Sequence, residues 1–415
     1  MDDHELRKHL LGSKKTERII FAATPETKAA LEAIADAGLE PRDIQYFYHG
    51  SANPFMIGDS LTPNMQVADW FGTRGIGSVH HSEACCTGYV AMQEAAMAIA
   101  SGEFDIVLSG AVDLAASLPV VGAPGHMRRD FPLEEMLPSI PMVYDRAYGR
   151  PLDSAFGISF DNWINEYRWT YDLSADDVDR ALNAVAKSLR RASVLNPLGF
   201  YDQDFDQVAA ANGMPDADAF LSSMFNPKVT QYLRVTGFET KCDGAAAMVL
   251  MPTEMAVARG LDHKVIEILG TGSAAYEGAT LANEKTGTIR GTKQVYELTG
   301  VSPDEVDLLF INDFFMAGDI CVPEEVGYVP RGEAWQYAID GRFAFDGDKP
   351  INTHGGRCNF GHAHGASGIA DIVEAVRQMR GEAGATQMKK LPQTTLFRGF
   401  GGGQNIRVQI IRTVD

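Results

Sequence analysis

Two stretches that lie far apart in this chain carry the same pattern, a glycine turn followed by an apolar strand. Residues 36–47 read DAGLEPRDIQYF and residues 297–309 read ELTGVSPDEVDLL. The residues that match at one common offset of 262 positions are Gly38 with Gly300, Pro41 with Pro303, Asp43 with Glu305, and Ile44 with Val306. A second echo relates the turn and helix after Ser82 to those after His362. A duplicated α/β half explains these matches, because each half can then bury one face of its sheet against the other. Chance similarity around a Gly-x-x-Pro turn is the alternative.

The order of apolar runs also favours an α/β fold, since strand-like runs alternate with alanine-rich helical stretches. We expect helices over residues 27–38 and 90–100, and strands over 44–48 and 104–112. Gly38 ends the first of these helices, because glycine readily takes the left-handed backbone of a C-cap.

A central segment differs in character from the two halves. Residues 126–235 are rich in aromatic residues, arginine, aspartate and asparagine, and we interpret them as an inserted loop domain that covers the site. The first half then comprises residues 1–125, completed by about 236–265, and the second half comprises residues 266–415. No low-complexity linker separates these parts, so we expect them to pack as one unit.

One helix stands out within the insertion. Residues 174–191 predict a helix that Ser174 caps, with two aspartates in its first turn. Its last turns carry the basic triplet Lys187, Arg190 and Arg191. These residues could bind a phosphate group; an ordinary solvated helix face is the alternative.

Charge and cysteine usage exclude several classes of protein. The net charge is −19, which makes nonspecific binding to nucleic acid or to an anionic membrane unfavourable. No apolar run reaches the ~20 residues that span a bilayer, and the charged start MDDHELRKHLLGSKK has no signal-peptide core. The 5 cysteines are scattered without the paired spacing of a zinc site. We therefore expect a soluble cytoplasmic protein with reduced thiols and no metal site.

The segment HHSEACCTGY, residues 80–89, places two cysteines in a turn of small residues where a helix begins. The N–H groups and the dipole at a helix N-terminus stabilise a thiolate, so we expect the pKa of such a thiol to fall from about 8.5 toward ~4–7. The following amide would also point toward an oxyanion on an acyl group. Cys85 is therefore a candidate nucleophile; a small buried hydrophobic side chain is the alternative for both Cys85 and Cys86.

A glycine-rich loop in the second half carries histidines. Residues 352–368 read NTHGGRCNFGHAHGASG, and His362 lies just before the sequence GASG, where a helix should start. Backbone rich in glycine can approach a ligand closely. A cysteine with a histidine is the minimal pair for acyl transfer, one as the nucleophile and the other as base or oxyanion donor. A structural histidine is the alternative.

Two further segments complete the set. Residues 311–315 (INDFF) end a strand with a polar side chain, Asn312, that can order a water. Residues 399–404 (GFGGGQ) follow a strand over 394–397 and could form a loop of backbone N–H donors. A plain turn is the alternative for this second loop.

Five motifs, in the family's order, resemble those of the thiolase superfamily. They are ACCTG at 84–88, like the Cys-x-x-Gly nucleophile loop; CDGAAAMVL at 242–250, like the Asp-Gly-Ala-Ala-Ala strand; NDFF at 312–315, like Asn-Glu-x-Phe; GHAHGASG at 361–368, like Gly-His-Pro-x-Gly-Ala-Ser-Gly; and GFGGG at 399–403, like Cys-x-Gly-Gly-Gly. The motif Arg-x-x-x-x-x-Asn-Pro at 190–197 resembles the sterol-carrier-protein-X-like branch. This resemblance implies a thiolase-like α/β fold with two duplicated βαβαβ-type halves in a five-layered α-β-α-β-α arrangement.

The resemblance also implies a role for each matched residue. Cys85 would attack the carbonyl of an acyl-CoA and carry the acyl group as a thioester. His362 would deprotonate Cys85 and, with a water held by Asn312, stabilise the thioester oxyanion of the other reaction partner. The backbone amides of Cys85 and Gly401 would form the oxyanion hole of the acyl enzyme. Coenzyme A would be a substrate rather than a tightly bound cofactor, and the basic triplet would be a candidate contact for it.

The chain departs from the family's pattern in three respects. Typical thiolases carry a second, acid/base cysteine where this chain has Gly399, and sterol-carrier-protein-X-like members place it where this chain has Phe314. Cys358 and His364, both in the histidine loop, are candidate replacements. The first strand of the family's fold is also missing, unless residues 17–22 (ERIIFA) supply it.

Without the second cysteine, the chain looks most like thiolase-fold catalytic subunits that work with a small partner bearing a zinc ribbon and an OB fold. That group includes acyltransferases of polyketide-like pathways, steroid side-chain aldolases and the benzoylsuccinyl-CoA thiolases of aromatic degradation, of which the last is most similar in general appearance. The resemblance also implies a homodimer. Aromatic residues of the insertion could line a pocket for a phenyl group, although core packing explains them equally; they include Phe156, Trp163, Tyr167 and Trp169.

Three functions follow as hypotheses. The first is a thiolase that cleaves a bulky 3-oxoacyl-CoA, such as benzoylsuccinyl-CoA, with CoA through acyl-Cys85. The second is a thiolase-like aldolase or C-acyltransferase that acts on a CoA thioester. The third is a non-catalytic subunit, against which the presence of Cys85, His362 and Asn312 argues.

Overall fold

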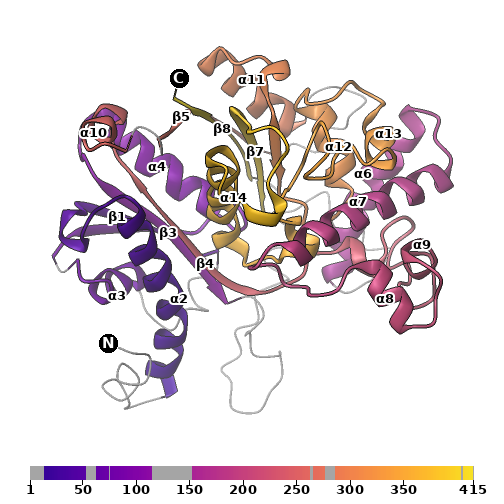
Figure 1. Cartoon of the computed structure of the whole chain (residues 1–415), viewed down its shortest axis with the longest axis horizontal. Coiled ribbons are helices and arrows are strands. Elements are labelled where there is room, and N and C mark those ends of the chain that lie inside the picture. The colour runs from indigo at the N-terminus through magenta and orange to yellow at the C-terminus, as the bar shows by residue number, and fades with distance from the viewer. Residues whose placement is uncertain are drawn as a thin grey trace.

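A computed structural model describes residues 14–52, 62–73, 75–114, 152–261, 265–275, 286–402 and 405–414, with side chains described from residue 25 onward but not for 152–160. Figure 1 shows two twisted sheets with helices between them and on their outer sides. Among the residues that the structure describes, no helix is both long enough and apolar enough to cross a membrane.

The first sheet belongs to the nucleophile half and is completed by a strand from beyond the insertion. Its strands are β1 (Tyr46–Gly50), β2 (Gly77–His81), β3 (Val107–Leu114) and β4 (Asp243–Leu250). Their order is β2-β1-β3-β4, in which the first three strands run parallel and β4 runs antiparallel to β3. The strand β3 is buried along its whole length, as a central strand with both faces covered must be.

The second sheet belongs to the histidine half. Its strands are β5 (Ile266–Ala275), β6 (Leu308–Ile311), β7 (Thr394–Gly401) and β8 (Asn405–Thr413), in the order β5-β8-β7-β6. Strands β6 and β7 run parallel, and β8 is antiparallel to both of its neighbours. Each sheet therefore contains parallel neighbouring strands and one strand of opposite direction, β4 in the first sheet and β8 in the second. This shared pattern is what a duplicated half predicts.

Five layers result from packing helices on both faces of each sheet. Between the sheets lie α4 (Thr87–Ser101) and α14 (His364–Arg380), whose apolar side chains share one core with β1, β3, β6 and β7. On the outer face of the first sheet lie α2 (Lys14–Asp36), α3 (Pro63–Trp70) and α10 (Thr253–Ala258). On the outer face of the second lie α11 (Gly287–Thr299) and α12 (Gly318–Glu325). The α-β-α-β-α arrangement is confirmed.

The repeat found in the sequence is also a repeat in structure. Gly38 follows α2 and Gly300 follows α11, both with a left-handed backbone (φ +64° and +71°). Each is followed by a short 3-10 helix closed by a capping box, η1 (Pro41–Asp43) and η7 (Pro303–Glu305). The strands β1 and β6 come next, so the same residues end a helix and start a strand in both halves.

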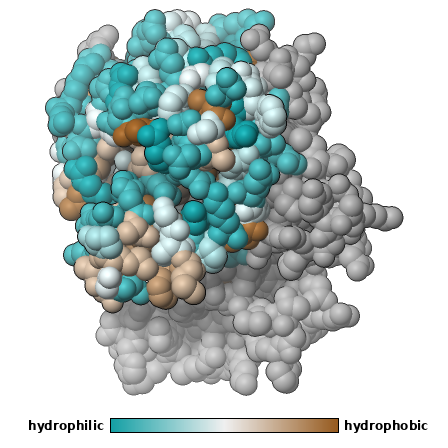
Figure 2. Space-filling view, turned by 90° about the vertical axis from the view of Figure 1, so that its right-hand side faces the viewer, coloured by the Kyte–Doolittle hydropathy of each residue, from teal (hydrophilic) through white to brown (hydrophobic). Residues whose placement is uncertain are grey.

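The inserted helices pack against the outer face of the second sheet. They are α6 (Leu152–Thr170), α7 (Ala175–Leu195), α8 (Phe205–Ala211) and α9 (Ala217–Leu221), and they share an apolar core with α12 and α13 (Ala334–Ile339). The Ser174 hydroxyl accepts a hydrogen bond from the Asp177 amide at 3.1 Å, which confirms the predicted cap. Figure 2 shows the outward face of this region, mostly hydrophilic with a paler brown patch at its lower edge.

The remaining short helices are η4 (Val235–Gly237), η8 (Gly356–Phe360) and η9 (Gly384–Thr386).

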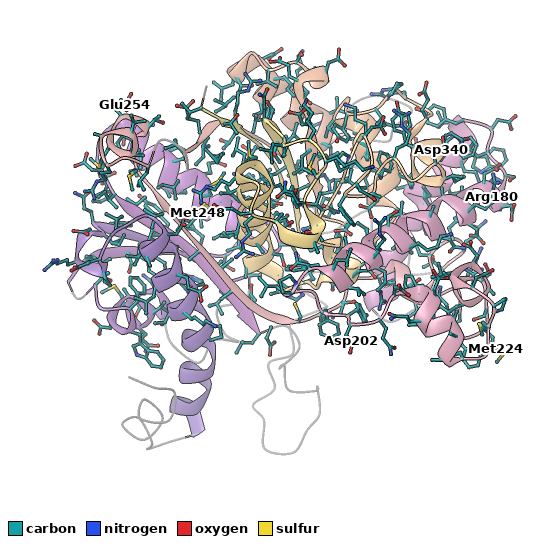
Figure 3. The ribbon with its side chains drawn as sticks, viewed as in Figure 1. Arg180, Asp202, Met224, Met248, Glu254 and Asp340 are labelled. Atoms are coloured by element: carbon teal, nitrogen blue, oxygen red, sulfur yellow. The ribbon has the colours of Figure 1, made fainter. Side chains whose placement is uncertain are left out.

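Glu254 on α10 and Arg180 on α7 lie toward opposite ends of the molecule's long axis (Figure 3). The first half and the insertion are thus separated along that axis, with the central helices between them.

One expectation about secondary structure was wrong, and one open alternative is now settled. Residues 17–22 do not supply the missing first strand, because they lie inside α2, and the first sheet has no strand before that helix among the described residues. Gly399 and Gly401 belong to strand β7 rather than to a loop after it, because β7 continues through Gly401 and pairs with Asn405. The segment 126–151, at the start of the predicted insertion, lies outside the described residues.

Candidate active site

The nucleophile loop and the histidine loop meet between the two sheets. The Sγ atom of Cys85 lies 3.2 Å from Nε2 of His362. Cys85 comes just before the N-cap of α4, and His362 comes two residues before α14 begins. The N-termini of both central helices therefore face one point, and each half supplies one of the two reactive side chains.

The backbone around Cys85 is held in an unusual conformation. Ala84 has φ +49°, in the left-handed region that a residue with a Cβ rarely adopts. The hydroxyl of Thr87 fixes this turn, because it accepts from the Glu83 amide at 2.8 Å and donates to the Ala84 carbonyl at 2.6 Å. Strain of this kind persists only where surrounding bonds enforce it, and it turns the Cys85 side chain toward the second half.

Cys86 faces the other way and is part of the core. It is fully buried, and its thiol donates to the Asn405 carbonyl on the second sheet at 3.4 Å. Burial raises the pKa of this thiol to about 12. Of the two adjacent cysteines, only Cys85 contacts a base.

Asp113, at the end of β3, connects the segment after β1 to the start of α14. One carboxylate oxygen accepts from the Gly365 amide in the first turn of α14 at 2.7 Å and from the Ala52 amide at 2.9 Å. The other accepts from the Ser51 hydroxyl at 2.9 Å. The carboxylate thus satisfies N–H groups that would otherwise be unpaired at a helix start, and it fixes the distance between the two halves.

The thiol of Cys85 is neutral in the resting site, which corrects the expectation of a thiolate. Burial raises the pKa of Cys85 well above its usual range, and the nearby Glu239 carboxylate raises it further, while the Arg357 guanidinium opposes them. The helix N-terminus does not outweigh this loss of solvation. Burial also lowers the pKa of His362 well below its usual value, helped by His364 and Arg357, so the imidazole is uncharged. A neutral thiol beside a neutral imidazole requires the histidine to act as a base.

The other nitrogen of His362 sets its orientation. Nδ1 lies 3.1 Å from the hydroxyl of Ser367 on α14. With Nδ1 donating to that hydroxyl, Nε2 presents its lone pair to Cys85. This is the tautomer that can take the thiol proton.

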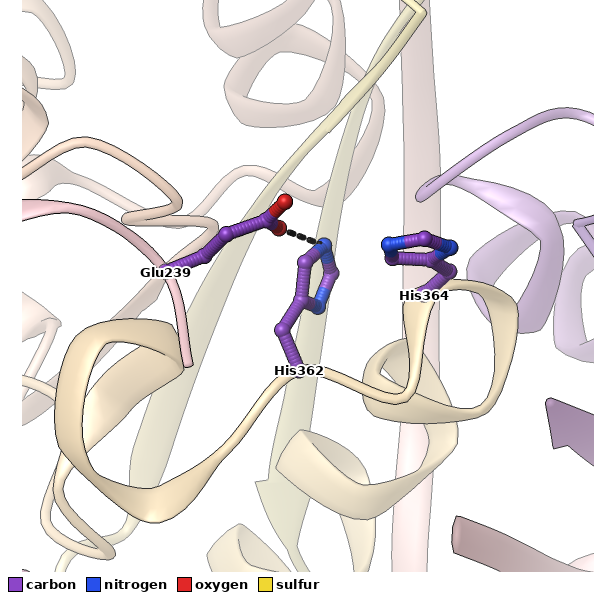
Figure 4. Close-up of side chains that lie close together, drawn as sticks. All are labelled: Glu239, His362 and His364. Atoms are coloured by element: carbon purple, nitrogen blue, oxygen red, sulfur yellow. Dashed lines mark ion pairs between the residues drawn. The ribbon is translucent and has the colours of Figure 1, made fainter. Parts of the chain in front are cut away.

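Glu239 is a site residue that the sequence analysis missed. Its Oε2 lies 3.4 Å from Nε2 of His362, and its side chain retains 20% exposure whereas His362 has none. Figure 4 shows the carboxylate and the ring of His364 on the two sides of His362. The ligand atoms of Glu239, His362 and His364 all lie within 4.8 Å of one another, close enough to share a cation. Burial lowers the pKa of His364 to about 4.

Asn312 and Gly401 meet at the end of strand β7. The Asn312 side chain donates from Nδ2 to the Phe400 carbonyl at 2.8 Å, which leaves its buried Oδ1 able to accept from a water or substrate group. The Gly401 backbone packs on the nucleophile loop so closely that a Cβ there would lie 3.0 Å from the Cys86 amide nitrogen. Their roles in the reaction stay predictions.

Known proteins match both halves. The family model described as thiolase C-terminal domain-like matches residues 273–412, and the one described as β-ketoacyl synthase, N-terminal domain matches residues 46–128. The acetyl-CoA acetyltransferase of Methanothermobacter thermautotrophicus is 26% identical over 390 residues, which cover 92% of this chain and 92% of the relative. The chain belongs to the thiolase superfamily. It is an acyltransferase of the thiolase type.

Two further relatives and one solved structure refine this thiolase assignment. The benzoylsuccinyl-CoA thiolase subunit BbsB of Thauera aromatica is 24% identical, with 91% of this chain and 90% of the relative covered. Sterol carrier protein 2 of Bos taurus is 23% identical, with 87% and 63% covered, which supports the sterol-carrier-protein-2-like branch. The structure titled Ltp2-ChsH2(DUF35) aldolase superposes with a TM-score of 0.70 at 22% identity, covering 94% of this chain and 93% of that one, and so shares the fold.

This thiolase carries no cysteine at either position of the family's second cysteine. A Cβ at Gly399 would lie 2.5 Å from the ring of Tyr89, so this ring occupies the space of the missing side chain. Phe314 packs on Phe400 with stacked rings 5.5 Å apart. The thiol of Cys358, the first candidate replacement, is buried and donates to the Asp313 carbonyl at 3.0 Å. Neither a glycine nor a phenylalanine can move a proton.

A buried ionic network supports the histidine loop of the thiolase site. The guanidinium of Arg357 pairs with both oxygens of Asp371 on α14, at 2.7 and 2.5 Å. Asp371 also contacts Nε2 of His354 at 2.8 Å and accepts from the Tyr89 hydroxyl. Burial alone would raise the pKa of Asp371, but Arg357 and His354 hold it below its ordinary value. The network ties α4, α14 and the histidine loop together.

The basic triplet does not form an open phosphate site in this thiolase. Lys187 pairs with Asp218 at 2.8 Å, and Arg191 pairs with Asp346 at 2.7 Å. Arg190 is buried, donates to Asn359 at 2.8 Å and stacks on the ring of Tyr201 at 3.3 Å. These residues instead tie α7 to its neighbours.

The aromatic residues of the insertion are placed separately. Tyr167 is fully buried in the core, and its hydroxyl donates to Glu324 at 2.5 Å. Trp163 packs against the same core, whereas Trp169 is 72% exposed. Phe156 lies among the residues whose side chains are not described. Core packing accounts for Tyr167 and Trp163, and the three described rings do not form one pocket.

Proposed function

We propose that this chain cleaves a bulky 3-oxoacyl-CoA with coenzyme A, through an acyl group carried on Cys85. The observation that carries the proposal is the 3.2 Å contact between Cys85 Sγ and His362 Nε2, in which each half of the thiolase fold supplies one partner. Coenzyme A acts in this proposal as a substrate, and no tightly bound cofactor is required.

The proposed reaction assigns each step to a residue of this site. His362 takes the proton of Cys85, and the thiolate attacks the 3-oxo carbonyl, because only the thiolate is an effective nucleophile. The amides of Cys85 and Gly401 bind the alkoxide that forms. When the bond between C2 and C3 breaks, its electron pair becomes an enolate on the departing thioester, whose oxygen is stabilised by the His362 N–H and a water held by Asn312.

Mass spectrometry of the intact protein and of its peptides tests this proposal. We expect one acyl group on Cys85 after incubation with a 3-oxoacyl-CoA in the absence of free CoA, and its release as acyl-CoA when CoA is added. Cys86→Ser is the matched control, since the buried Cys86 thiol points into the second sheet. Acylation of Cys86, or full turnover by Cys85→Ala, would overturn the assignment.

The bulky substrate is the finer part of the proposal. Its support is the similarity, over 91% of the chain, to a subunit of Thauera aromatica that is named for the thiolysis of benzoylsuccinyl-CoA. A panel of acetoacetyl-CoA, 3-oxo-3-phenylpropionyl-CoA and benzoylsuccinyl-CoA tests it by the ratio of kcat/KM values. A preference of acetoacetyl-CoA over both aryl substrates would contradict it.

A second candidate function is retro-aldol cleavage of a CoA thioester. Two observations favour it: the second cysteine is absent at Gly399 and Phe314, and the fold matches a structure titled as an aldolase. Consumption of CoA separates the two reactions. Thiolysis requires one free CoA per bond cleaved, whereas aldol cleavage releases an aldehyde or ketone without CoA and leaves Cys85 unmodified.

We also propose that the chain works as a homodimer with a small partner subunit that carries a zinc ribbon and an OB fold. The support is that the matched aldolase structure is titled as a two-component assembly and that the Thauera relative is named as a subunit. Native mass spectrometry of protein purified from its host measures the stoichiometry. Full activity of the isolated chain would remove the need for a partner, and activity absent under all conditions would favour a non-catalytic subunit.

A further inference from the structure

The proposed reaction needs a residue that moves a proton at carbon. The enolate released by cleavage must gain a proton at C2, and the incoming CoA thiol must lose one before it attacks acyl-Cys85. In thiolases a second cysteine does both, and here its two family positions are Gly399, filled by the Tyr89 ring, and Phe314, stacked on Phe400. The proton must come from another side chain.

The two replacements suggested by the sequence fit this task poorly. The Cys358 thiol is directed to the Asp313 carbonyl at 3.0 Å, and burial raises its pKa well above the usual range. His364 lies close to the reactive pair, but its ring meets that of His362 edge to face, with the ring centroids 5.0 Å apart, rather than through a hydrogen bond. Neither side chain is therefore placed to exchange a proton with Nε2 of His362.

Glu239 is held against the reactive pair by backbone on both sides. Its amide donates to the Phe314 carbonyl at 2.9 Å, and the next amide, of Thr240, donates to the Arg357 carbonyl at 3.0 Å. The amide of His362 in turn donates to the Thr240 carbonyl at 2.7 Å. The segment before β4 thus runs between the Asn312 loop and the histidine loop, which fixes Glu239 relative to His362.

The carboxylate and the thiol share one nitrogen. Nε2 of His362 lies 3.4 Å from Glu239 Oε2 and 3.2 Å from Cys85 Sγ. One ring nitrogen has either a lone pair or a proton, so it can serve only one of these neighbours at a time. The Glu239 side chain retains 20% exposure, whereas the His362 side chain has none, so the carboxylate is in reach of a bound substrate.

We propose that Glu239 is the acid/base residue that replaces the missing second cysteine and moves the proton at C2 and at the CoA thiol. This role rests on the proposed thiolase function. It assigns a catalytic task to a residue outside the family's motifs.

Protons balance over the full cycle. Cys85 gives its proton to His362 and attacks the C3 carbonyl, and the C2–C3 bond then breaks. The imidazolium passes that proton across the 3.4 Å contact to the Glu239 carboxylate, and the carboxylic acid so formed protonates C2. In the second half the carboxylate takes the proton of CoA, the CoA sulfur attacks acyl-Cys85, and the departing Cys85 sulfur recovers a proton from Glu239 through His362.

The test compares Glu239→Gln with wild type on the 3-oxoacyl-CoA that the wild type cleaves best. General acid–base residues typically contribute about 10²–10⁴-fold, so we expect kcat to fall at least about 100-fold. Glu239→Ala should regain at least about tenfold when formate is added, since a small carboxylic acid can occupy the vacated space, and formate should not stimulate wild type. Glu254→Gln, on exposed α10 at the far end of the molecule, is the matched control and should retain wild-type activity.

The outcomes separate this inference from the proposed function. If wild type neither acylates Cys85 nor consumes CoA, the thiolase function fails. If wild type does both and Glu239→Gln remains within about threefold, or if His364→Gln rather than Glu239→Gln abolishes turnover, the role of Glu239 is overturned alone. Formate rescue requires a folded site, so it also excludes misfolding as the cause of a loss. All assays contain EDTA, which removes any cation shared by the cluster.

Discussion

Replacing Gly399 by alanine should destabilise the protein more than any ordinary glycine replacement in a strand. A Cβ at this position would lie 2.5 and 2.8 Å from two carbons of the Tyr89 ring and 3.2 Å from Cys86 Sγ. Tyr89 is fully buried, and its hydroxyl is bonded to Asp371. The ring therefore cannot move aside without breaking a hydrogen bond inside the buried ionic network.

The magnitude follows from these two contributions. Forcing an extra carbon into a packed core costs about 1–3 kcal/mol, and a buried polar group left without its partner costs about 1–3 kcal/mol more. We expect the free energy of unfolding to fall by about 2–6 kcal/mol. In a Tyr89→Leu background the same change should cost less than ~1 kcal/mol, because the ring carbons nearest to the new Cβ are gone.

Urea unfolding at one protein concentration measures wild type, Gly399→Ala, Tyr89→Leu and the double variant. Gly237→Ala is the matched control. A Cβ at Gly237 would meet its nearest atoms at 3.7 Å, an ordinary contact, so its effect should be within about 1 kcal/mol. If Gly399→Ala costs no more than this control, or costs the same with and without the Tyr89 ring, the ring does not fill the position of the second cysteine and the reasoning is refuted.

Three further predictions concern charge. Arg357→Met should lower the free energy of unfolding by about 3–5 kcal/mol in urea titrations, because it leaves the Asp371 carboxylate buried without its guanidinium; a change under ~1 kcal/mol would contradict this. Iodoacetamide should modify Cys85 slowly at pH 7 and faster as pH rises past 9, followed by peptide mass spectrometry, because burial raises its pKa; rapid modification at pH 6 would show a resting thiolate. Burial raises the pKa of Glu325 to about 7 from its ordinary 4.5, so the folded state keeps a proton that the unfolded chain releases, and stability from this group is lost as pH rises between those values. Glu325→Gln should therefore gain up to about 3 kcal/mol over wild type at pH 8 and nothing at pH 4 in paired urea titrations; an equal effect at both pH values would refute this.

The fold could be predicted from the sequence because the duplication is encoded locally. Gly38 and Gly300 each end a helix with a left-handed backbone, and a Pro-led 3-10 turn then starts a strand in both halves. These signals involve only a few neighbouring residues, so they can be recognised in a sequence without knowledge of tertiary contacts. Residues 17–22 could have been a strand or a helix on the sequence alone, because an apolar run of that length is compatible with both, and the structure places them in a helix.

The site could be predicted only in part. The sequence indicated Cys85 and His362 because both precede central helices, Cys85 in a turn of small residues and His362 in a glycine-rich loop. The pKa of Cys85 was predicted with the wrong sign, because a helix N-terminus is visible in a sequence whereas desolvation and the Glu239 carboxylate come from distant segments. Glu239 itself carries no motif. The one signal that could have found it is its place three residues before the CDGAAA motif, on the segment that leads into β4.

The loss of the second cysteine and the placement of Glu239 are connected through one chain of contacts. The Tyr89 ring fills the space beside Gly399, and its hydroxyl bonds to Asp371, which pairs with the Arg357 guanidinium. The carbonyl of Arg357 accepts the amide that follows Glu239. The tyrosine that excludes a side chain at the old acid/base position therefore belongs to the network that holds the proposed new one. Removing the tyrosine hydroxyl, with Tyr89→Phe, should consequently weaken catalysis through Glu239 without opening the space at Gly399; a variant that keeps full kcat while losing stability would show that the network supports the fold alone.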